Sequence, residues 1–282
     1  MSGAALSRPV ELARPEALVW AYGCSPVQRA RLTDATRGRA RLRVLESAAE
    51  LTACLRLPEA PDVIVVSVVE AEAREAAALL RLIAASCPRA ALVGYVDGDP
   101  AMLPGIASLA AAGVHQLLFT GMNDTGAQCR AVLQEARRQC AAAVVLAALR
   151  SVFPDALHPV AEAALARPAA VTDVRALADA LGVHRKTLFN RCARACSLPP
   201  AGVLGFTRLA LVAYLLESTT HTVESIALEL GYPSPTALRN GIRRYTGLRA
   251  TDIRAGGGLS LVLGALRTRL EATAPPQPLH LV

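Results

Sequence analysis

Two segments of similar sequence decide the fold of the carboxy-terminal half: VRALADALGV at residues 174–183 and VESIALELGY at residues 223–232. The second copy begins 49 residues after the first, and the apolar, alanine and glycine positions match at six places in register. Apolar residues spaced three and four apart share one face of a helix. Each copy therefore predicts a short amphipathic helix that ends at its glycine.

The residues around each copy fit a helix-turn-helix unit. Asp173 and Thr222 precede the two helices, where a side-chain oxygen caps the first turn. The alanine in each copy lets a second helix cross closely, and the glycine supplies the positive φ of a tight turn. A Leu-x-Asn pattern follows at residues 188–190 and again at 238–240, so the second turn is one residue longer. The duplication predicts two helix-turn-helix units.

The helix after each turn carries polar side chains on its predicted outward face. The candidate DNA contacts are Arg185, Lys186, Thr187, Asn190 and Arg191 in the first unit, and Ser234, Thr236, Arg239, Asn240 and Arg243 in the second. Arginine and lysine bond phosphates or guanine, and asparagine pairs bidentately with adenine. A single charged helix would more simply be the solvated face of a helical bundle. Two copies in register favour DNA binding over that alternative.

Residues 155–254 resemble the AraC/XylS family of transcription regulators. The resemblance is carried by Gly231–Ser234, Ile242–Arg254, Arg208-Leu209 and Leu215-Leu216. It implies that both units sit on one linker helix and place their recognition helices in successive major grooves, about 34 Å apart. Ala250 stands where the family usually has proline. Asn190 and Asn240 stand where many members have arginine, so the bases that are read do not transfer.

The first 125 residues alternate short apolar runs with longer amphipathic segments, a pattern typical of a parallel sheet covered by helices. The expected strands are Ala17–Tyr22, Ala40–Leu45, Asp62–Val68, Ala90–Val96 and Val114–Phe119. The expected helices are Pro26–Ala35, Ala48–Leu57, Ala71–Ser86, Pro104–Ala112 and Thr125–Gln139, the last continuing to residue 149. Five βα units are predicted.

This half resembles a response-regulator receiver in its order of elements, with residues 111–114 similar to the start of the receiver's last strand. A working receiver needs acidic residues after the first strand, an aspartate at the end of the third strand and a lysine at the end of the fifth. Here those places hold Tyr22-Gly23-Cys24, Ser67 and Thr120. Without them no cation is held and no acyl phosphate forms. We therefore expect a degenerate receiver that acts through dimerisation or contact with another protein or a ligand, and expect Ser67 to be a hydrogen-bonded serine at a strand end.

The predicted fold class is α/β plus all-α. A receiver-like (flavodoxin-like) domain with a five-stranded parallel sheet and an extended last helix occupies residues 1–150. An all-helical double helix-turn-helix domain follows at 151–255, and a flexible tail at 256–282. In this tail, Gly256-Gly257-Gly258 are expected to form a flexible joint, followed by a short amphipathic segment at Leu259–Leu270. Residues 140–149 are apolar nearly all round, so we expect them to be buried in a dimer seam or against the neighbouring domain.

Composition limits the other functions. The net charge is +7, and residues 151–282 hold 14 basic against 9 acidic residues, while residues 1–150 hold 16 against 14. Lys186 is the only lysine, so a general preference for arginine accounts for most basic positions. The seven cysteines lack the spacing of a zinc site, so we expect most of them to be reduced, buried side chains. Neither a catalytic constellation nor a cofactor motif is recognised, so no enzyme, metal or cofactor is expected.

We therefore expect a cytoplasmic transcription regulator with double-stranded DNA as its partner, and RNA polymerase and a second copy of the chain as further partners. No secretory signal is recognised, and no uninterrupted apolar run reaches the roughly 20 residues that cross a membrane. The alternative is a ligand-responsive regulator whose α/β domain binds a small molecule at the carboxyl edge of the sheet, after Tyr22, Ser67 and Tyr95. No glycine-rich phosphate loop supports this alternative.

Overall fold

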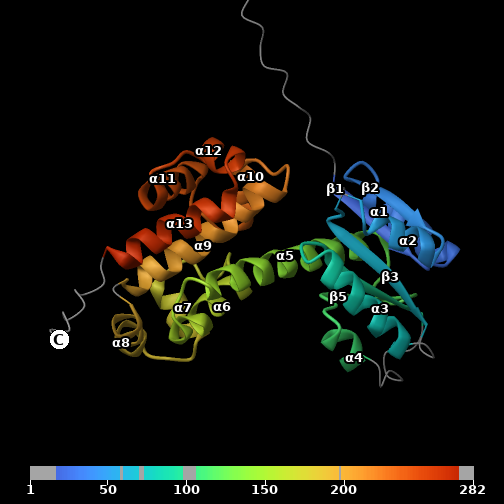
Figure 1. Ribbon diagram of the computed structural model, residues 1–282, viewed down its shortest axis with the longest axis horizontal. Helices are drawn as coiled ribbons and strands as arrows, with labels where there is room; N and C mark the ends of the chain where they lie inside the picture. Colours follow the sequence, from blue (N-terminus) through green and yellow to red (C-terminus); the bar gives the residue numbers. More distant parts are fainter. Residues whose placement is uncertain (1–16, 58–59, 70–72, 98–105, 197, 273–282) are drawn as a thin grey trace, which may run out of the picture.

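The computed structural model describes residues 17–57, 60–69, 73–97, 106–196 and 198–272. It has a half built around a β-sheet and a half built only from helices, joined by one long helix (Figure 1). The two termini of the described chain lie in different halves.

Five parallel strands form the sheet. They are β1 (Ala17–Tyr22), β2 (Ala40–Leu45), β3 (Val63–Val69), β4 (Ala91–Asp97) and β5 (Gln116–Phe119), in the order β2-β1-β3-β4-β5. Nearly continuous apolar runs suit β1, β3 and β4, because helices cover both faces of a parallel sheet. The order is that of a flavodoxin-like, doubly wound fold. The predicted α/β class is confirmed, with β5 beginning two residues later than expected.

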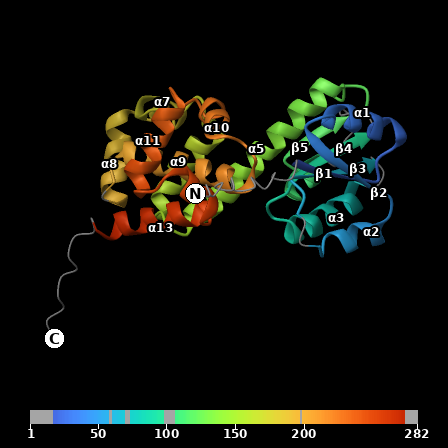
Figure 2. The same ribbon diagram turned by 90° about the horizontal axis from the view of Figure 1, so that it is seen from above.

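Helices lie on both faces of the sheet (Figure 2). One face packs against α1 (Pro26–Thr36) and α5 (Gly126–Arg150), and the other against α2 (Ala48–Cys54), α3 (Ala73–Ser86) and α4 (Ile106–Ala111). Helix α2 ends three residues before the predicted end at Leu57. The predicted starts of α3 at Ala71 and of α4 at Pro104 lie outside the described residues.

The helical half surrounds a central helix, α9 (Pro200–Ser218). The other elements are a 3₁₀ turn η3 (Asp155–Leu157), α6 (His158–Ala166), α7 (Val174–Ala180), α8 (Arg185–Ala195), α10 (Val223–Glu229), α11 (Pro235–Thr246), α12 (Ala250–Ala255) and α13 (Gly258–Glu271). Among the described residues, α9 is the one helix whose length and composition would let it cross a membrane, and 72% of its most apolar window is buried against its neighbours. Its place at the centre of this half accounts for its apolar sequence.

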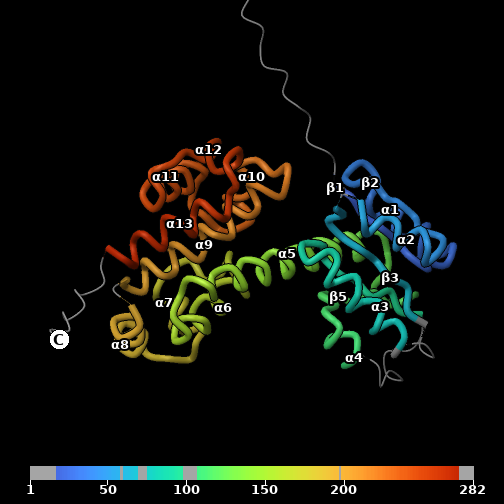
Figure 3. Tube along the Cα trace, viewed as in Figure 1, coloured from blue at the N-terminus to red at the C-terminus, as the bar shows by residue number. Residues whose placement is uncertain are grey.

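The core of the helical half extends across the predicted boundary at residue 150. Ala141, Val145 and Leu149 of α5 are buried together with Leu209 and Val212 of α9. Of the two roles expected for this apolar run, packing inside the chain is therefore the one observed. The trace of α5 passes without a break from the sheet into the helical half (Figure 3).

The expected flexible tail is also different in the structure. Helix α13 packs along α9 and buries Leu259, Val262 and Leu266. Gly258, the first residue of α13, allows this close packing, because a Cβ on it would lie 2.7 Å from the carbonyl oxygen of Ala213 on α9. The prediction of a flexible joint was wrong because this glycine serves a close approach of two helices. Residues 273–282 lie outside the described residues.

Five of the seven cysteines are buried, and all seven are free thiols. Burial raises the pKa of Cys24 to about 12 and that of Cys192 to about 11. This agrees with the expected role of reduced, buried side chains. Within the described residues, no group of three or more histidine, cysteine and acidic side chains is placed to hold a metal ion.

Candidate nucleic-acid interface

The two helix-turn-helix units repeat the same local hydrogen bonds. Asp173 caps α7 by accepting from the backbone N–H of Ala176 at 2.8 Å, and Thr222 caps α10 by accepting from that of Ser225 at 3.1 Å. Both turns contain a glycine with φ between +64° and +68°. In both turns the residue after the glycine donates its backbone N–H to the carbonyl of the buried alanine, at 3.0 and 2.8 Å. The predicted duplication is confirmed at the level of single bonds.

Apolar residues fix the inner face of each recognition helix, as the sequence predicted. Leu188 and Cys192 of α8 are fully buried, as are Leu238 and Ile242 of α11. A helix anchored on these positions turns the residues between them outward. The polar positions of both helices therefore face solvent.

On α8, the candidate residues Arg185, Lys186, Thr187 and Asn190 are exposed, and Arg191 is half-buried. His184 caps the helix, because its Nδ1 accepts the backbone N–H of Lys186 at 3.2 Å. The helix carries no acidic residue. Its outward surface is polar and positive.

On α11, Thr236, Arg239, Asn240 and Arg243 are exposed. Ser234 is half-buried, because its hydroxyl caps the helix by accepting the backbone N–H of Ala237 at 3.1 Å. The guanidinium of Arg239 forms an ion pair with Glu224 on α10. Two of the ten candidate residues thus make contacts within the second unit.

Both recognition helices lie at the end of the helical half that is far from the sheet (Figures 1 and 2). Helix α9 runs between the two units and contacts both of them. No part of the sheet lies over α8 or α11 in either view. The outward face of each is therefore open to a partner.

Two side chains on α8 were missed by the sequence analysis. Phe189 is 44% exposed although it is aromatic, and it is adjacent to the exposed Asn190. Arg194 lines a hollow of about 400 Å³ together with Thr187, Asn190 and Arg191. The helical spacing from Asn190 to Arg194 was a signal for the arginine. Phe189 gave no such signal because an aromatic residue beside Leu188 suggests core.

A buried arginine connects the two units. Arg208 of α9 donates to the carbonyl oxygens of Pro168 and of Val171, the latter at 3.0 Å, just before the first unit. It also donates to the carbonyl of Leu230 at the end of α10, at 2.7 Å. Its guanidinium lies 4.6 Å from the ring centre of Tyr232. Arg208 thus fixes the second unit's turn to the segment that leads into the first unit.

At the carboxyl edge of the sheet, the receiver-like positions are joined by a buried glutamine. Gln28 has no exposed surface, and its side-chain oxygen accepts from the Ser67 hydroxyl at 3.0 Å. Its side-chain nitrogen donates to the hydroxyl of Thr120 at 3.3 Å. Nearby, the hydroxyl of Tyr95 donates to buried Asp124 at 2.8 Å. Ser67 is therefore hydrogen-bonded at its strand end, as expected.

Two helix-turn-helix units held on one buried linker helix define a DNA-binding transcription regulator. A family model described as a helix-turn-helix domain matches residues 177–256. The DNA-binding domain of AdpA, a global transcriptional factor solved in complex with a target DNA, is 32% identical to this chain. The match covers 36% of this chain and 91% of that domain, with a TM-score of 0.31. Residues 177–256 are therefore a helix-turn-helix domain of the AraC type.

Two solved response regulators also match. One from Thermotoga maritima is 16% identical, covering 43% of this chain and 98% of its own, with a TM-score of 0.37. One from Burkholderia pseudomallei, solved with a phosphorylated aspartic acid, a calcium ion and citrate, is 17% identical, covering 63% and 98%, with a TM-score of 0.35. A comparison with curated protein sequences finds no match.

Proposed function

We propose that α8 and α11 enter successive major grooves of double-stranded DNA and that the chain regulates transcription through this contact. The observation that supports it best is the pair of registered units on one helix, with Asn190 and Asn240 both exposed. In this proposal the asparagines contact bases, and the arginines and Lys186 contact phosphates or guanine. Ser234 contributes the capped amino end of α11, which suits a phosphate.

A genome-wide binding selection with the purified full chain at moderate salt tests the proposal. We expect one preferred duplex motif with two half-sites about one helical turn apart. Asn190→Ala and Asn240→Ala should each weaken binding to that motif by about 1–3 kcal/mol and relax the base preference at one half-site. Thr268→Ala on α13 is the control, because it is exposed and lies outside both units. A chain that selects no motif contradicts the proposal.

The basic residues have a different expected signature. Arg243→Gln should weaken binding to all sequences about equally and reduce the slope of log affinity against log salt by about one. Arg239→Gln should have a smaller effect on affinity. Arg239 must give up its ion pair with Glu224 when it contacts a phosphate, so its net contribution to binding is smaller. Equal effects of the two changes would count against these assigned roles.

We further propose that the regulator works without phosphorylation. The support is chemical: Ser67, at the acceptor position, bonds a buried amide where a receiver has a carboxylate next to a cation. Full-length protein incubated with acetyl phosphate and Mg²⁺ should gain no phosphoryl group by intact mass, and its DNA affinity should not change. A mass increase of one phosphoryl group on Ser67 would refute this part.

As further partners we propose RNA polymerase and a second copy of the chain. We also propose that the protein acts in the cytoplasm. Because Val145 and Leu149 are buried within the chain, a dimer needs another surface. Leu228 on α10 is 84% exposed and is one apolar position open to a protein partner. Light scattering coupled to gel filtration, with Leu228→Ser as the comparison, reports whether a dimer forms and whether it uses this residue.

A small-molecule site at the carboxyl edge of the sheet is the weaker proposal. The hydroxyls of Ser67 and Tyr95, which would face such a ligand, are bonded to Gln28 and Asp124. Polar groups that are already paired have little to gain from a ligand.

A further inference from the structure

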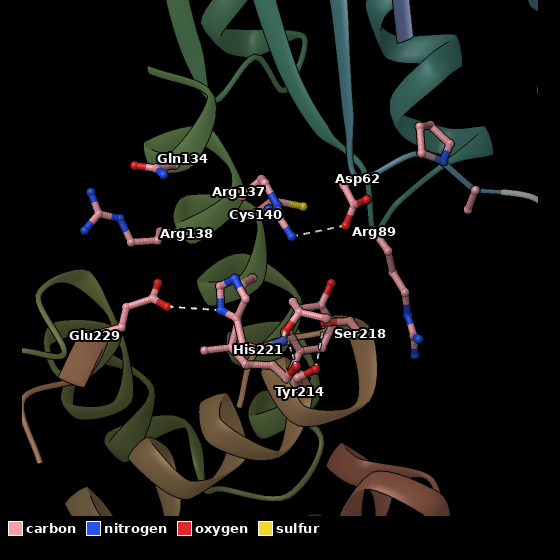
Figure 4. Close-up of a pocket in the computed structure, with 15 residues that line it drawn as sticks. Asp62, Arg89, Gln134, Arg137, Arg138, Cys140, Tyr214, Ser218, His221 and Glu229 are labelled. Carbon is pink, nitrogen blue, oxygen red and sulfur yellow. Dashed lines mark hydrogen bonds and ion pairs between the residues drawn. The ribbon is translucent and has the colours of Figure 1, made fainter. Parts of the chain in front are cut away.

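A cavity of about 410 Å³ lies between the two halves of the molecule (Figure 4). Its walls come from residues 60–62 before β3, the middle of α5, the end of α9, His221 just before α10 and Glu229 at the end of α10. It lies at the amino ends of the strands, opposite the edge where Ser67 is found. A second cavity of about 460 Å³ adjoins it and shares Arg138, Ala141, Leu215 and Glu229.

Arginines of α5 supply positive charge where the two cavities meet. Arg137 donates one hydrogen bond to Asp62 at 3.2 Å, and Arg138 pairs with Glu135 on its own helix. A guanidinium has five N–H donors. Within the described part of the chain, these pairs use only a few of them, so donors remain on both arginines.

The acidic groups of the wall are already engaged. Asp62 accepts the backbone N–H of Leu18 at 2.8 Å with one carboxylate oxygen and Arg137 with the other. Glu229 lies 3.4 Å from Nδ1 of His221, and this neighbour lowers the pKa of the Glu229 carboxyl (Figure 4). Each of these carboxylates therefore already has a neighbouring partner, and an incoming anion would meet the N–H donors that Arg137 and Arg138 do not use in their own pairs.

The second cavity supplies an apolar wall. Leu165, Leu211 and Leu215 line it, and Ala141 lies between the two cavities. At the far rim of the first cavity, Arg89 before β4 pairs with Glu217 of α9 at 3.4 Å and so bridges the two halves. A ligand here would touch both halves at once.

We propose that the joined cavities bind a small organic anion and that its binding changes the affinity for DNA. Its oxyanion group pairs with Arg137 and Arg138, as guanidinium favours planar, bidentate contact with such groups. Its apolar body lies against Leu211 and Leu215. The binding step stands independently of the proposed function, and only the effect on DNA rests on it.

The coupling follows from what else forms these walls. Residues 167–170 and Leu230 line the second cavity, and Arg208 bonds the carbonyls of Pro168 and Leu230. Leu230 immediately precedes the turn glycine of the second unit. A ligand that shifts these residues therefore alters how the two recognition helices are held, and by linkage DNA alters the ligand affinity by the same factor.

Binding is tested without DNA on the full-length chain, with salicylate and 8-anilinonaphthalene-1-sulfonate as probes, because each joins an anionic group to an aromatic body. We expect saturable binding of one molecule per chain by calorimetry and fluorescence. Arg138→Gln should weaken it about tenfold, as expected for the loss of one charge-assisted bond. Arg137→Gln with Arg138→Gln should weaken it further.

Arg37→Gln is the matched control, because Arg37 also pairs with an acidic residue three positions away, Asp34 at 3.5 Å, but lies outside both cavities. It should bind like the unchanged chain. If the double variant unfolds, probe binding by the Arg138→Gln variant alone tests the site. No saturable binding by the unchanged chain, or equal binding by Arg138→Gln, overturns the proposed site.

The regulatory step is tested by the affinity for the selected duplex with and without saturating salicylate. We expect a change of at least fivefold, lost in Arg138→Gln, and an equal change in salicylate affinity when DNA is bound. Unchanged DNA affinity overturns the regulatory step alone. A chain that binds salicylate but selects no duplex refutes the proposed function and leaves the binding site standing.

Discussion

Gly182 and Gly231 close the same turn in the two units but meet different surroundings. Both have positive φ, +64° and +68°. A Cβ at Gly182 would meet no atom within 4 Å, whereas one at Gly231 would lie 2.7 Å from the carbonyl oxygen of Ala169. The first glycine is needed for its backbone angle, and the second also for space.

Alanine substitution separates these two needs. Gly182→Ala should lower the free energy of unfolding by about 1–2 kcal/mol, the ordinary strain of a left-handed residue. Gly231→Ala should cost about 1–3 kcal/mol more, because backbone must move to relieve the clash. Urea unfolding of the two variants measures the difference. Equal losses would show that Ala169 gives way freely.

Phe189 makes a prediction about base preference. An exposed aromatic ring on a recognition helix suits apolar contact with a thymine methyl group. If Phe189 makes this contact, replacing one thymine of the selected duplex by uracil should weaken binding by about 0.8 kcal/mol, or about fourfold. Phe189→Ala should bind both duplexes equally, while the Thr268→Ala control keeps the difference. A uracil effect that persists in Phe189→Ala would exclude this role.

At the residue scale, the sequence predicts which side chains are exposed but not which individual contacts they make. The ten candidate residues follow from helical periodicity alone, and eight of them are exposed. That Ser234 is a cap and that Arg239 pairs with Glu224 depends on where neighbouring elements end and cross, which periodicity does not fix.

At the scale of elements, Arg208 gives the largely apolar helix α9 a polar contact to its neighbours inside the core. It donates to three backbone carbonyls inside the core, two from the segment that leads into the first unit and one from the second unit. Such acceptors cost free energy when they are left unpaired.

Replacing this arginine should therefore affect both units. Arg208→Met should lower the free energy of unfolding by about 3 kcal/mol or more, because three carbonyls lose their partner. Arg267→Met on α13 is the control, since Arg267 is exposed. Thermal unfolding followed by circular dichroism compares them. A loss no larger than that of Arg267→Met would mean that water replaces the guanidinium.

The elements were predicted well where the sequence repeats or alternates. Two units in register predicted α7, α8, α10 and α11, and the apolar runs predicted all five strands. Helix α13 was recognised as amphipathic, but its packing on α9 was not, because three consecutive glycines are equally typical of a flexible joint and of a close helix contact.

At the scale of the whole molecule, the helical core draws on residues outside 151–255. Val145 and Leu149 before this range, and Leu259, Val262 and Leu266 after it, are all buried in that core. The predicted boundaries left these residues out. Hydrophobic periodicity shows that one face of a helix is apolar, but it does not show which half of the molecule packs against that face.

Two fragments test this core. Residues 151–255 alone lack five large buried side chains, each contributing about 1.5–3 kcal/mol, which together match the usual total stability of about 5–15 kcal/mol. This fragment should show no cooperative thermal transition. Residues 138–272 restore all five and should unfold cooperatively. A cooperative transition in the shorter fragment would show that α13 and the end of α5 are dispensable.

Because α5 is continuous, the rotation of one half relative to the other about the helix axis depends on the number of residues in α5 between them. Its 25 residues make a rod of about 37 Å. One alanine inserted after Cys140 would rotate the DNA-binding half by about 100° about the rod, separating Arg89 from Glu217, whereas seven would return it to within about 20°. If the sheet half controls DNA binding by torsion, operator affinity in such an insertion series should rise and fall with the helical period.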